Sequence, residues 1–374
     1  MKNKLINLSI LIFCFCSQKK EATTEFTSSE QLVIPIESNY SSTYEIANSW
    51  TDDYFIGYFF TNHSIDIFSL TDKTSLFQIK LPSQEPILFN KGGGVSKIGN
   101  QLYYKSSNSL YRIPFKENPD FLSETLQYQF GRALNFDGTE YLNSKKGYSV
   151  ALNDVPSANI IDNLLVLPYY DLSKSSTIAG IYFLNTDLEL EDHHAFQFNE
   201  DYQSSLKLYE GLNTPFVTTS SDNVLIQFPF TSELIVFDPK TNTEKKKSIP
   251  GKFITTKINP SPFEAGKYII PAIRCSAQFW EVTWDPYRKL YYRIEKEERF
   301  PEAGERINFR RGYHWINVIS EDLELLGHFK IPADCFAKPM VAKEGIYFHR
   351  TNQENESEVR FTFFEGGLPL EKEF

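Results

Sequence analysis

The sequence predicts an all-β protein, and three features of the chain support that class. Apolar residues after position 30 recur with a period of two, as in 54–60 (YFIGYFF), 64–70 (SIDIFSL) and 359–364 (VRFTFF). Phe, Tyr, Ile, Val and Thr dominate these runs, and such residues fit a pleated, half-buried surface. Polar turn signals such as 238–242 (DPKTN) separate the runs, and no stretch has a long amphipathic helical pattern.

Composition agrees with a large folded domain. The chain has 374 residues, of which 41% are hydrophobic and 15% aromatic, so it is too apolar to be disordered. Lys and Arg number 38 against 48 Asp and Glu, which gives a net charge of −10. A nucleic-acid partner needs a basic face, and this balance predicts no such partner.

The strand runs fall into repeating units of three or four strands. The units cover 50–81, 94–130, 158–198, 217–250, 266–332 and 338–366. A spacing of about 40–60 residues with this content is typical of a β-propeller, so we expect six blades. Seven blades are the alternative, because 120–160 and 255–310 are hard to divide, and a pair of β-sandwiches is the competing fold.

The last unit is one strand short. The segment 31–37 (QLVIPIE) has the strand pattern and no partner in its own unit. We expect it to add the outer strand of the last blade, which would close the ring and leave no open sheet edge. Residues 31–374 are therefore predicted to form a single domain.

The first residues have the layout of a secretory signal peptide. Lys2 and Lys4 precede an apolar stretch over 5–15, which is too short for the roughly 20 residues that span a bilayer. Residues 1–15 are therefore predicted to be the signal peptide, and the competing interpretation is a buried N-terminal strand.

The apolar stretch ends in 13–16 (FCFC), followed by SQKKE, which resembles the lipobox of bacterial lipoproteins. We expect Cys16 to be lipidated, with Cys14 as the alternative because Leu11 lies three residues before it. Several acyl chains on one cysteine give lasting anchorage. Residues 16–30 would be a flexible tether. The protein would then be exported and held in the cell envelope, at the periplasmic or surface face of the outer membrane.

The segment 284–294 (WDPYRKLYYRI) resembles a hairpin found in a family of uncharacterised Bacteroidota lipoproteins. The family is a domain of unknown function described as a six-bladed β-propeller, and its hairpin carries a similar Asp-Pro-Tyr-Arg and Tyr-Tyr-Arg pattern. The resemblance implies an exported, anchored propeller. It supplies no substrate and no catalytic residue.

Two aromatic and cationic segments are candidate binding surfaces. Arginine and aromatic side chains on a concave surface suit a small molecule, a glycan or a protein ligand. The candidates are Trp284, Arg288 and Arg293 in the hairpin, and Arg310, Arg311, Tyr313, His314 and Trp315 in the next segment. The structural alternative is that these side chains satisfy carbonyl groups and fill space between blades.

No metal site, cofactor or catalytic motif is predicted. Adjacent histidines such as His193 and His194 point to opposite faces of a strand, and a solvated turn is the expectation there. Cys275 and Cys335 are either a disulfide or two free thiols. Glu281 and Asp285 are the first carboxylates to consider for glycoside hydrolysis. The sequence thus predicts a ligand- or partner-binding module, with a carbohydrate-active hydrolase or lyase as the alternative.

Overall fold

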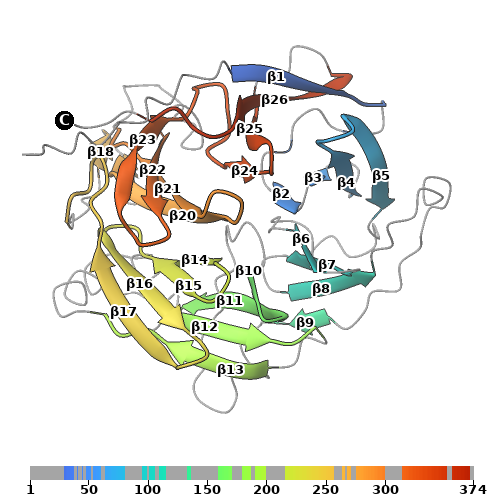
Figure 1. Ribbon diagram of the computed structural model, residues 1–374. Coiled ribbons are helices and arrows are strands. Elements are labelled where there is room, and N and C mark those ends of the chain that lie inside the picture. Colours follow the sequence, from blue (N-terminus) through green and yellow to red (C-terminus); the bar gives the residue numbers. More distant parts are fainter. Residues whose placement is uncertain are drawn as a thin grey trace, which may run out of the picture.

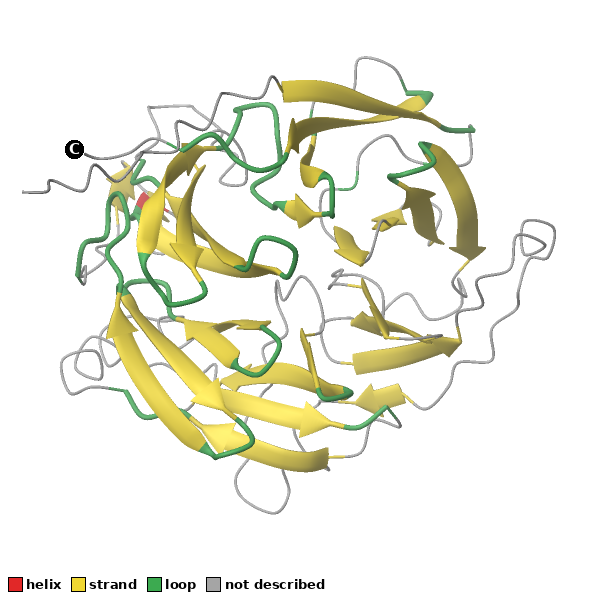
Figure 2. Ribbon diagram, viewed as in Figure 1, coloured by secondary structure: helices red, strands yellow, loops and turns green. Residues whose placement is uncertain are grey.

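The computed structural model is a ring of β-sheets around a common centre (Figure 1). The structure describes residues 29–37, 40, 44, 48–51, 54–59, 64–80, 95–98, 101–105, 109–114, 133–135, 159–170, 179–186, 190–198, 215–256, 263–265, 268–270, 275–299, 314–351 and 356–370. Within these ranges nearly every ordered element is a strand (Figure 2). None of the helices found there has the length and apolarity that crossing a membrane requires.

Among the described residues, six sheets have four strands each, and a seventh has two. The first two sheets contain β2 (Asn48–Thr51), β3 (Tyr54–Phe59), β4 (Ser64–Ser69), β5 (Thr74–Lys80), and β6 (Val95–Ile98), β7 (Gln101–Lys105), β8 (Ser109–Pro114), β9 (Ala133–Asn135). The next two contain β10 (Asn159–Ile161), β11 (Leu164–Tyr170), β12 (Ala179–Leu184), β13 (Leu190–Ala195), and β14 (Phe216–Thr219), β15 (Val224–Gln227), β16 (Glu233–Asp238), β17 (Thr243–Ser248). The last two contain β20 (Gln278–Asp285), β21 (Leu290–Lys296), β22 (His314–Ser320), β23 (Leu325–Lys330), and β24 (Met340–Val341), β25 (Gly345–His349), β26 (Glu358–Glu365), β1 (Ser29–Pro35). The small sheet pairs β18 (Phe263–Ala265) with β19 (Tyr268–Ile270).

The four-stranded sheets are antiparallel and radial, and the strand nearest the centre is β2, β6, β10, β14, β20 or β24 (Figure 1). This arrangement is a β-propeller, so the predicted all-β propeller class is confirmed. The competing pair of stacked sandwiches is wrong, because the sheets do not stack in two layers but follow one another around the ring.

The predicted N-terminal closing strand is also confirmed. β1 pairs antiparallel with β26, from Ser29 opposite Phe364 to Pro35 opposite Glu358. The strand starts two residues earlier than the sequence predicted, so Ser29 and Glu30 belong to the sheet rather than to the tether. Ile34 is completely buried in an apolar cluster that includes side chains of both the first and the last sheet.

The antiparallel strand order places the connections at two ends of the ring. Connections between the first and second and between the third and fourth strands lie at one end, here called the short-turn face. Asn163, Asn242 and Lys289 have positive φ angles in such turns. The remaining connections lie at the opposite end, the long-loop face. Because β26 ends at the short-turn face and Ser29 pairs with Phe364, the N-terminal end of β1 also lies at the short-turn face.

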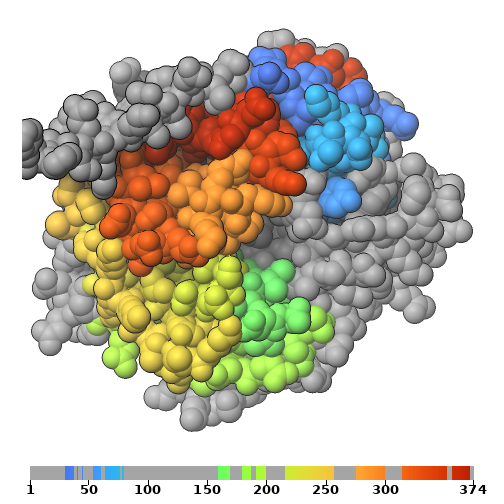
Figure 3. All heavy atoms as spheres, viewed as in Figure 1, coloured from blue at the N-terminus to red at the C-terminus, as the bar shows by residue number. Residues whose placement is uncertain are grey.

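Apolar faces of neighbouring sheets form the core. One cluster joins β10–β13 to β14–β17 through residues such as Phe183 and Phe237. Another joins β20–β23 to the closing sheet, with Phe329, Phe348 and Phe364 in edge-to-face or stacked contact. Figure 3 shows the atoms of the β14–β17 and β20–β23 sheets packed closely on the face in view. Burial between sheets therefore fixes the positions of side chains on β20–β23.

Candidate functional site

The β20–β23 sheet holds the described candidate residues, but it does not bring them together. Trp284 lies at the short-turn end of β20, opposite Tyr291, which in turn is opposite Ile319. His314 starts β22 at the long-loop end. It precedes Ile319 by five residues, which corresponds to about 17 Å along the strand. The predicted candidates Arg310, Arg311 and Tyr313 lie outside the described residues. The hairpin and the 310–315 segment are therefore at opposite ends of one sheet.

Asp285 organises the turn between β20 and β21. Its side chain is fully buried, and its Oδ1 accepts hydrogen bonds from the backbone N–H groups of Tyr287 and Arg288, each at 3.0 Å. Its Oδ2 accepts from the Tyr292 hydroxyl and from Arg288 Nη1, each at 2.9 Å. Burial raises the pKa of Tyr292 strongly, and the Asp285 charge adds to this effect. Asp285 therefore serves the turn, and it is not an accessible partner for Glu281 in glycoside hydrolysis.

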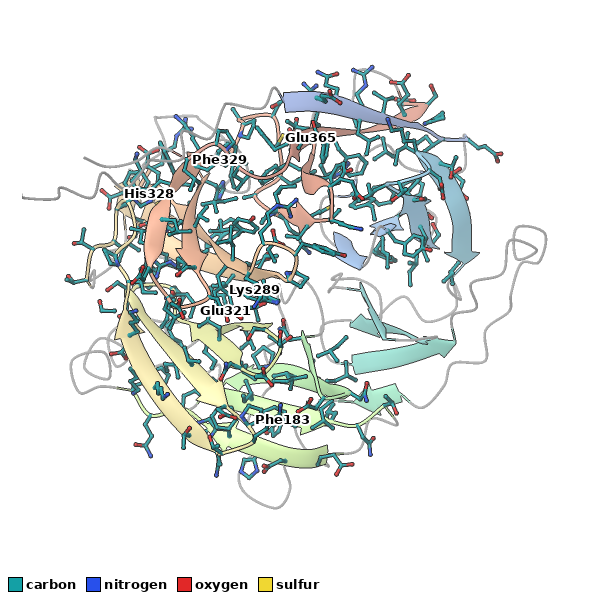
Figure 4. All side chains as sticks on the ribbon, in the orientation of Figure 1. Phe183, Lys289, Glu321, His328, Phe329 and Glu365 are labelled. Atoms are coloured by element: carbon teal, nitrogen blue, oxygen red, sulfur yellow. The ribbon has the colours of Figure 1, made fainter. Side chains whose placement is uncertain are left out.

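Arg288 ties this turn to the closing sheet. Nε donates to the carbonyl oxygen of Gly366 at 2.8 Å, and Nη1 and Nη2 donate to those of Ala342 and Lys343, each at 3.1 Å. Beside it, Lys289 Nζ lies 3.3 Å from Glu321 Oε2, so these two side chains point toward each other (Figure 4). Because backbone carbonyl oxygens accept the hydrogen bonds of its guanidinium, Arg288 satisfies carbonyl groups between sheets, as the structural alternative expects.

Arg293 is buried between two sheets. It is 0% exposed, and Nη2 donates to the carbonyl oxygens of Ile249 at 2.8 Å and Pro250 at 3.1 Å. Nη1 lies 3.3 Å from Gln227 Oε1, and the guanidinium carbon lies 4.0 Å from the centroid of the Phe279 ring. Burial lowers the pKa of Arg293, and Glu295 opposes that shift. This placement also favours the structural alternative, because a ligand at the surface cannot reach the side chain.

Glu295 is a key polar residue that the sequence did not reveal. Its Oε1 accepts from the backbone N–H groups of Phe253 at 2.9 Å and Ile254 at 2.8 Å. Its Oε2 accepts from the N–H of Lys252 at 2.7 Å and from Asn317 Nδ2 at 2.9 Å. A Cβ atom at Gly251 would lie only 2.5 Å from this carboxylate. Glu295 therefore fixes the loop that follows β17 against β21.

The adjacent residues His314 and Trp315 face opposite sides of β22. Lys252 Nζ lies 3.8 Å from the centroid of the Trp315 ring, and Lys330 Nζ lies 5.5 Å from it. The Phe253 ring contacts the same indole at 6.1 Å between centroids. Lysines and a phenylalanine thus surround Trp315, which is only 8% exposed.

A row of buried polar side chains lies on the other side of the sheet. Gln278 is the cross-strand partner of Lys296, and Lys296 is the cross-strand partner of His314, so all three share one face. They are 5%, 2% and 1% exposed respectively. The ring of Trp280 lies 4.5 Å from that of His314. We call these three residues the polar row; they occupy the long-loop end of a face that also carries the buried side chains of Ile294 and Ile316.

The polar row is electrostatically unusual. Burial lowers the pKa of Lys296 to about 8, although Cys275 and Glu298 oppose the shift. Burial and then the nearby Lys296 charge lower the pKa of His314 to about 3. Near pH 7 the lysine therefore carries a charge and the histidine is neutral. Within the described part of the chain, His314 Nε2 is buried and has no hydrogen-bond partner.

The lowered pKa of His314 predicts acid sensitivity. An unfolded chain binds a proton at His314 near pH 6.5, whereas the folded chain does not until about pH 3. The folded state therefore loses stability as pH falls through that window, by about 2 kcal/mol between pH 7 and pH 5. Replacing His314 by phenylalanine should remove this part of the pH dependence in urea unfolding curves. An unchanged difference between the two pH values would contradict the assignment.

The two cysteines do not form a disulfide. Cys275 and Cys335 are both buried free thiols, and burial raises the pKa of Cys335 to about 12, so this thiol is unreactive.

The solvated turn expected at His193 and His194 is wrong, because both lie in β13. His194 stacks on Phe237 at 4.0 Å and lies 3.0 Å from Glu244. Among the described residues, no cluster of His, Cys, Asp and Glu has the arrangement of a metal site.

Comparison with known proteins supports the class of fold. No protein-family model matches the chain, and no curated protein matches it either. The chain is similar to the crystal structure of a member of the DUF4221 family from Bacteroides vulgatus, with a TM-score of 0.64 and 15% identity over 91% of this chain and 98% of that chain. A luciferin-regenerating enzyme matches with a TM-score of 0.47 and 9% identity over 91% of this chain and 97% of that chain. A calcium-binding regucalcin from Agrobacterium tumefaciens matches with a TM-score of 0.45 and 9% identity over 92% of this chain and 97% of that chain.

At these identities the similarity shows the shared fold alone. The protein is a β-propeller, and one of its structural neighbours belongs to a Bacteroides family named as a domain of unknown function.

Proposed function

We propose that this chain is an exported, lipid-anchored β-propeller that binds a ligand or a partner at the long-loop end of the β20–β23 sheet. Each of the six four-stranded sheets is one blade in this proposal, and the chain is a distant relative of the DUF4221 protein. The observation that carries the proposed site is the polar row beside Trp280, which is buried next to an apolar cluster.

Burial of these groups supports a functional role. The His314 imidazole loses hydration on burial, and its Nε2 has no hydrogen-bond partner among the described residues, so its burial is unfavourable. Groups with strongly shifted pKa values gather at functional sites more often than elsewhere. Lys296 and His314 have such pKa shifts and are direct cross-strand neighbours.

The N-terminal sequence supports the anchor. Cys16 follows an apolar stretch, and the first strand begins at Ser29. About 13 residues separate the two positions, which corresponds to a maximum reach of roughly 45 Å. A lipid on Cys16 would therefore hold the propeller near a membrane without placing the domain in it.

The geometry at Asp285 disfavours the hydrolase or lyase alternative. Its first candidate pair needs two accessible carboxylates, and Asp285 is 0% exposed with hydrogen bonds to both oxygens. The hydrogen bonds of Asp285 to the turn explain its burial without any catalytic role.

Labelled palmitate tests the anchor. In cells of the source organism, the wild-type protein should take up label and stay with the membrane fraction. Cys16→Ser should take up none and appear in the soluble fraction, whereas Cys14→Ser should keep its label after the signal peptide is removed. Label on Cys16→Ser would contradict the proposal.

A panel of envelope glycans and small metabolites tests the site. Trp280→Ala should weaken binding of any ligand found by at least tenfold, because the indole forms a wall of the proposed site. Trp284→Ala is the matched control, since it removes a tryptophan at the opposite end of the same strand. If only Trp284→Ala weakens binding, the site lies at the short-turn face instead.

A further inference from the structure

We infer that residues 366–370, which follow β26, form a latch that can leave its place while the six four-stranded sheets stay folded. The segment lies against the joint between the β20–β23 sheet and the closing sheet. The inference does not depend on the proposed ligand site. It follows from how the segment begins, from how few hydrogen bonds hold it and from what its side chains cover.

Two glycines begin the latch. Gly366 has a φ angle of +71° and Gly367 one of +145°, and residues with a Cβ atom rarely adopt such angles. A Cβ atom at Gly366 would meet no atom of the described residues within 4 Å, so its φ angle accounts for the glycine and a close contact does not. Glycine also changes its φ angle at little cost, which suits a hinge. The chain can therefore swing away from the end of β26 at this point.

Few hydrogen bonds hold the latch closed. The Gly366 N–H donates to the carbonyl oxygen of Glu344 at 2.8 Å, and the Gly366 carbonyl oxygen accepts from Arg288 Nε at 2.8 Å. Within the described part of the chain, residues 367–370 form no hydrogen bond. Because Gly366 and Glu344 are both exposed, water can replace the bond between them when the segment leaves.

Arg288 keeps its other partners when the latch opens. Its remaining hydrogen bonds go to Asp285 and to the carbonyl oxygens of Ala342 and Lys343, none of which belongs to the latch. The turn before β21 therefore stays tied to the closing sheet after the bond to Gly366 breaks. Local opening is expected where hydrogen bonds are few and exposed to solvent.

Two leucines keep the latch closed. Leu368 and Leu370 are partly buried and pack against a cluster with members on both sheets, such as Ile316 and Phe348. Opening would expose this apolar surface to water, which opposes release. The surface involved is far smaller than the surface that unfolding of the sheets exposes, so the latch opens more readily than the ring.

A thiol at position 368 measures this opening. The mature chain with Cys16→Ser and Leu368→Cys is treated with iodoacetamide, and mass spectrometry follows the alkylation of each cysteine. Cys275 and Cys335 are buried free thiols, so they react only when the sheets unfold and are controls within the same molecule. The thiol at position 368 should react about tenfold faster than either of them, or more.

Urea separates local opening from global unfolding. Alkylation of Cys335 should accelerate by roughly tenfold or more per molar of urea, because global unfolding exposes a large surface. Alkylation at position 368 should accelerate by less than about twofold per molar, since opening of the latch exposes little surface. An equal dependence on urea at the two positions would overturn the inference.

Gly366→Ala separates opening from simple partial exposure of the thiol. Alanine makes no clash but is strained at a φ angle of +71°, so the closed latch is destabilised and alkylation at position 368 should accelerate by roughly 5–30-fold. Gly366→Asn is the matched control, because asparagine adopts a positive φ angle more readily and should have a smaller effect. If Gly366→Ala has no effect, the thiol reacts in the closed state, and the latch is disproved.

Leu370→Cys repeats the measurement from the second leucine and should show the same weak dependence on urea. A chain that folds with neither introduced thiol would also overturn the inference, because a segment that can leave the joint is not required for the sheets to fold.

Discussion

Glu295→Ala should lower the free energy of unfolding by about 3–5 kcal/mol. The substitution leaves three backbone N–H groups, those of Lys252, Phe253 and Ile254, buried or partly buried without their acceptor. It also removes the acceptor of Asn317 Nδ2 and the carboxylate that compensates the buried charge of Arg293. Urea unfolding followed by tryptophan fluorescence measures the loss.

Glu298→Ala is the matched control for this prediction. Glu298 follows the same strand and is exposed, so its removal should change stability by no more than about 0.5 kcal/mol. A loss below about 1 kcal/mol for Glu295→Ala would contradict the structural role assigned to its carboxylate.

Ile34→Ala should destabilise the ring by about 2–5 kcal/mol, because Ile34 is completely buried where the first and last sheets meet. Its cluster includes Phe55 of the first sheet and Phe361 of the last, so the lost contacts lie on both sides of the joint. Thermal unfolding measures the effect as a drop in melting temperature.

Val33→Ala is the control from the same strand. Val33 is 37% exposed and points away from the cluster, so its truncation removes little buried surface. If the two substitutions lower the melting temperature equally, β1 does not stabilise the ring through the packing described.

Much of the fold could be predicted from the sequence because strand patterning is local. The alternation in 31–37 marks which residues of β1 are buried, and Leu32 and Ile34 are indeed buried while Val33 is not. The same alternation correctly placed the closing strand. The sequence could not reveal Glu295, since it lies in a charged segment, 295–299 (EKEER), that has the composition of a solvated turn.

The site was harder to predict because neighbours in sequence are not neighbours in space. His314 and Trp315 are adjacent, yet one faces the closing sheet and the other faces the loop that follows β17. Arg293 looked like a ligand-binding cation, but its neighbours across the sheets are carbonyl groups. The cross-strand neighbours of Lys296 follow only from the strand register, which places residues 278, 296 and 314 side by side.

The strand that closes the ring is also the strand nearest the proposed anchor, and this has a mechanical consequence. Any tension on the N-terminal end reaches the folded domain first at Ser29, opposite Phe364. Such a pull would peel β1 from β26 one pair at a time, rather than load all their hydrogen bonds at once. A slack connection to the membrane would therefore protect the seam, and shortening that connection should make the propeller easier to open by force.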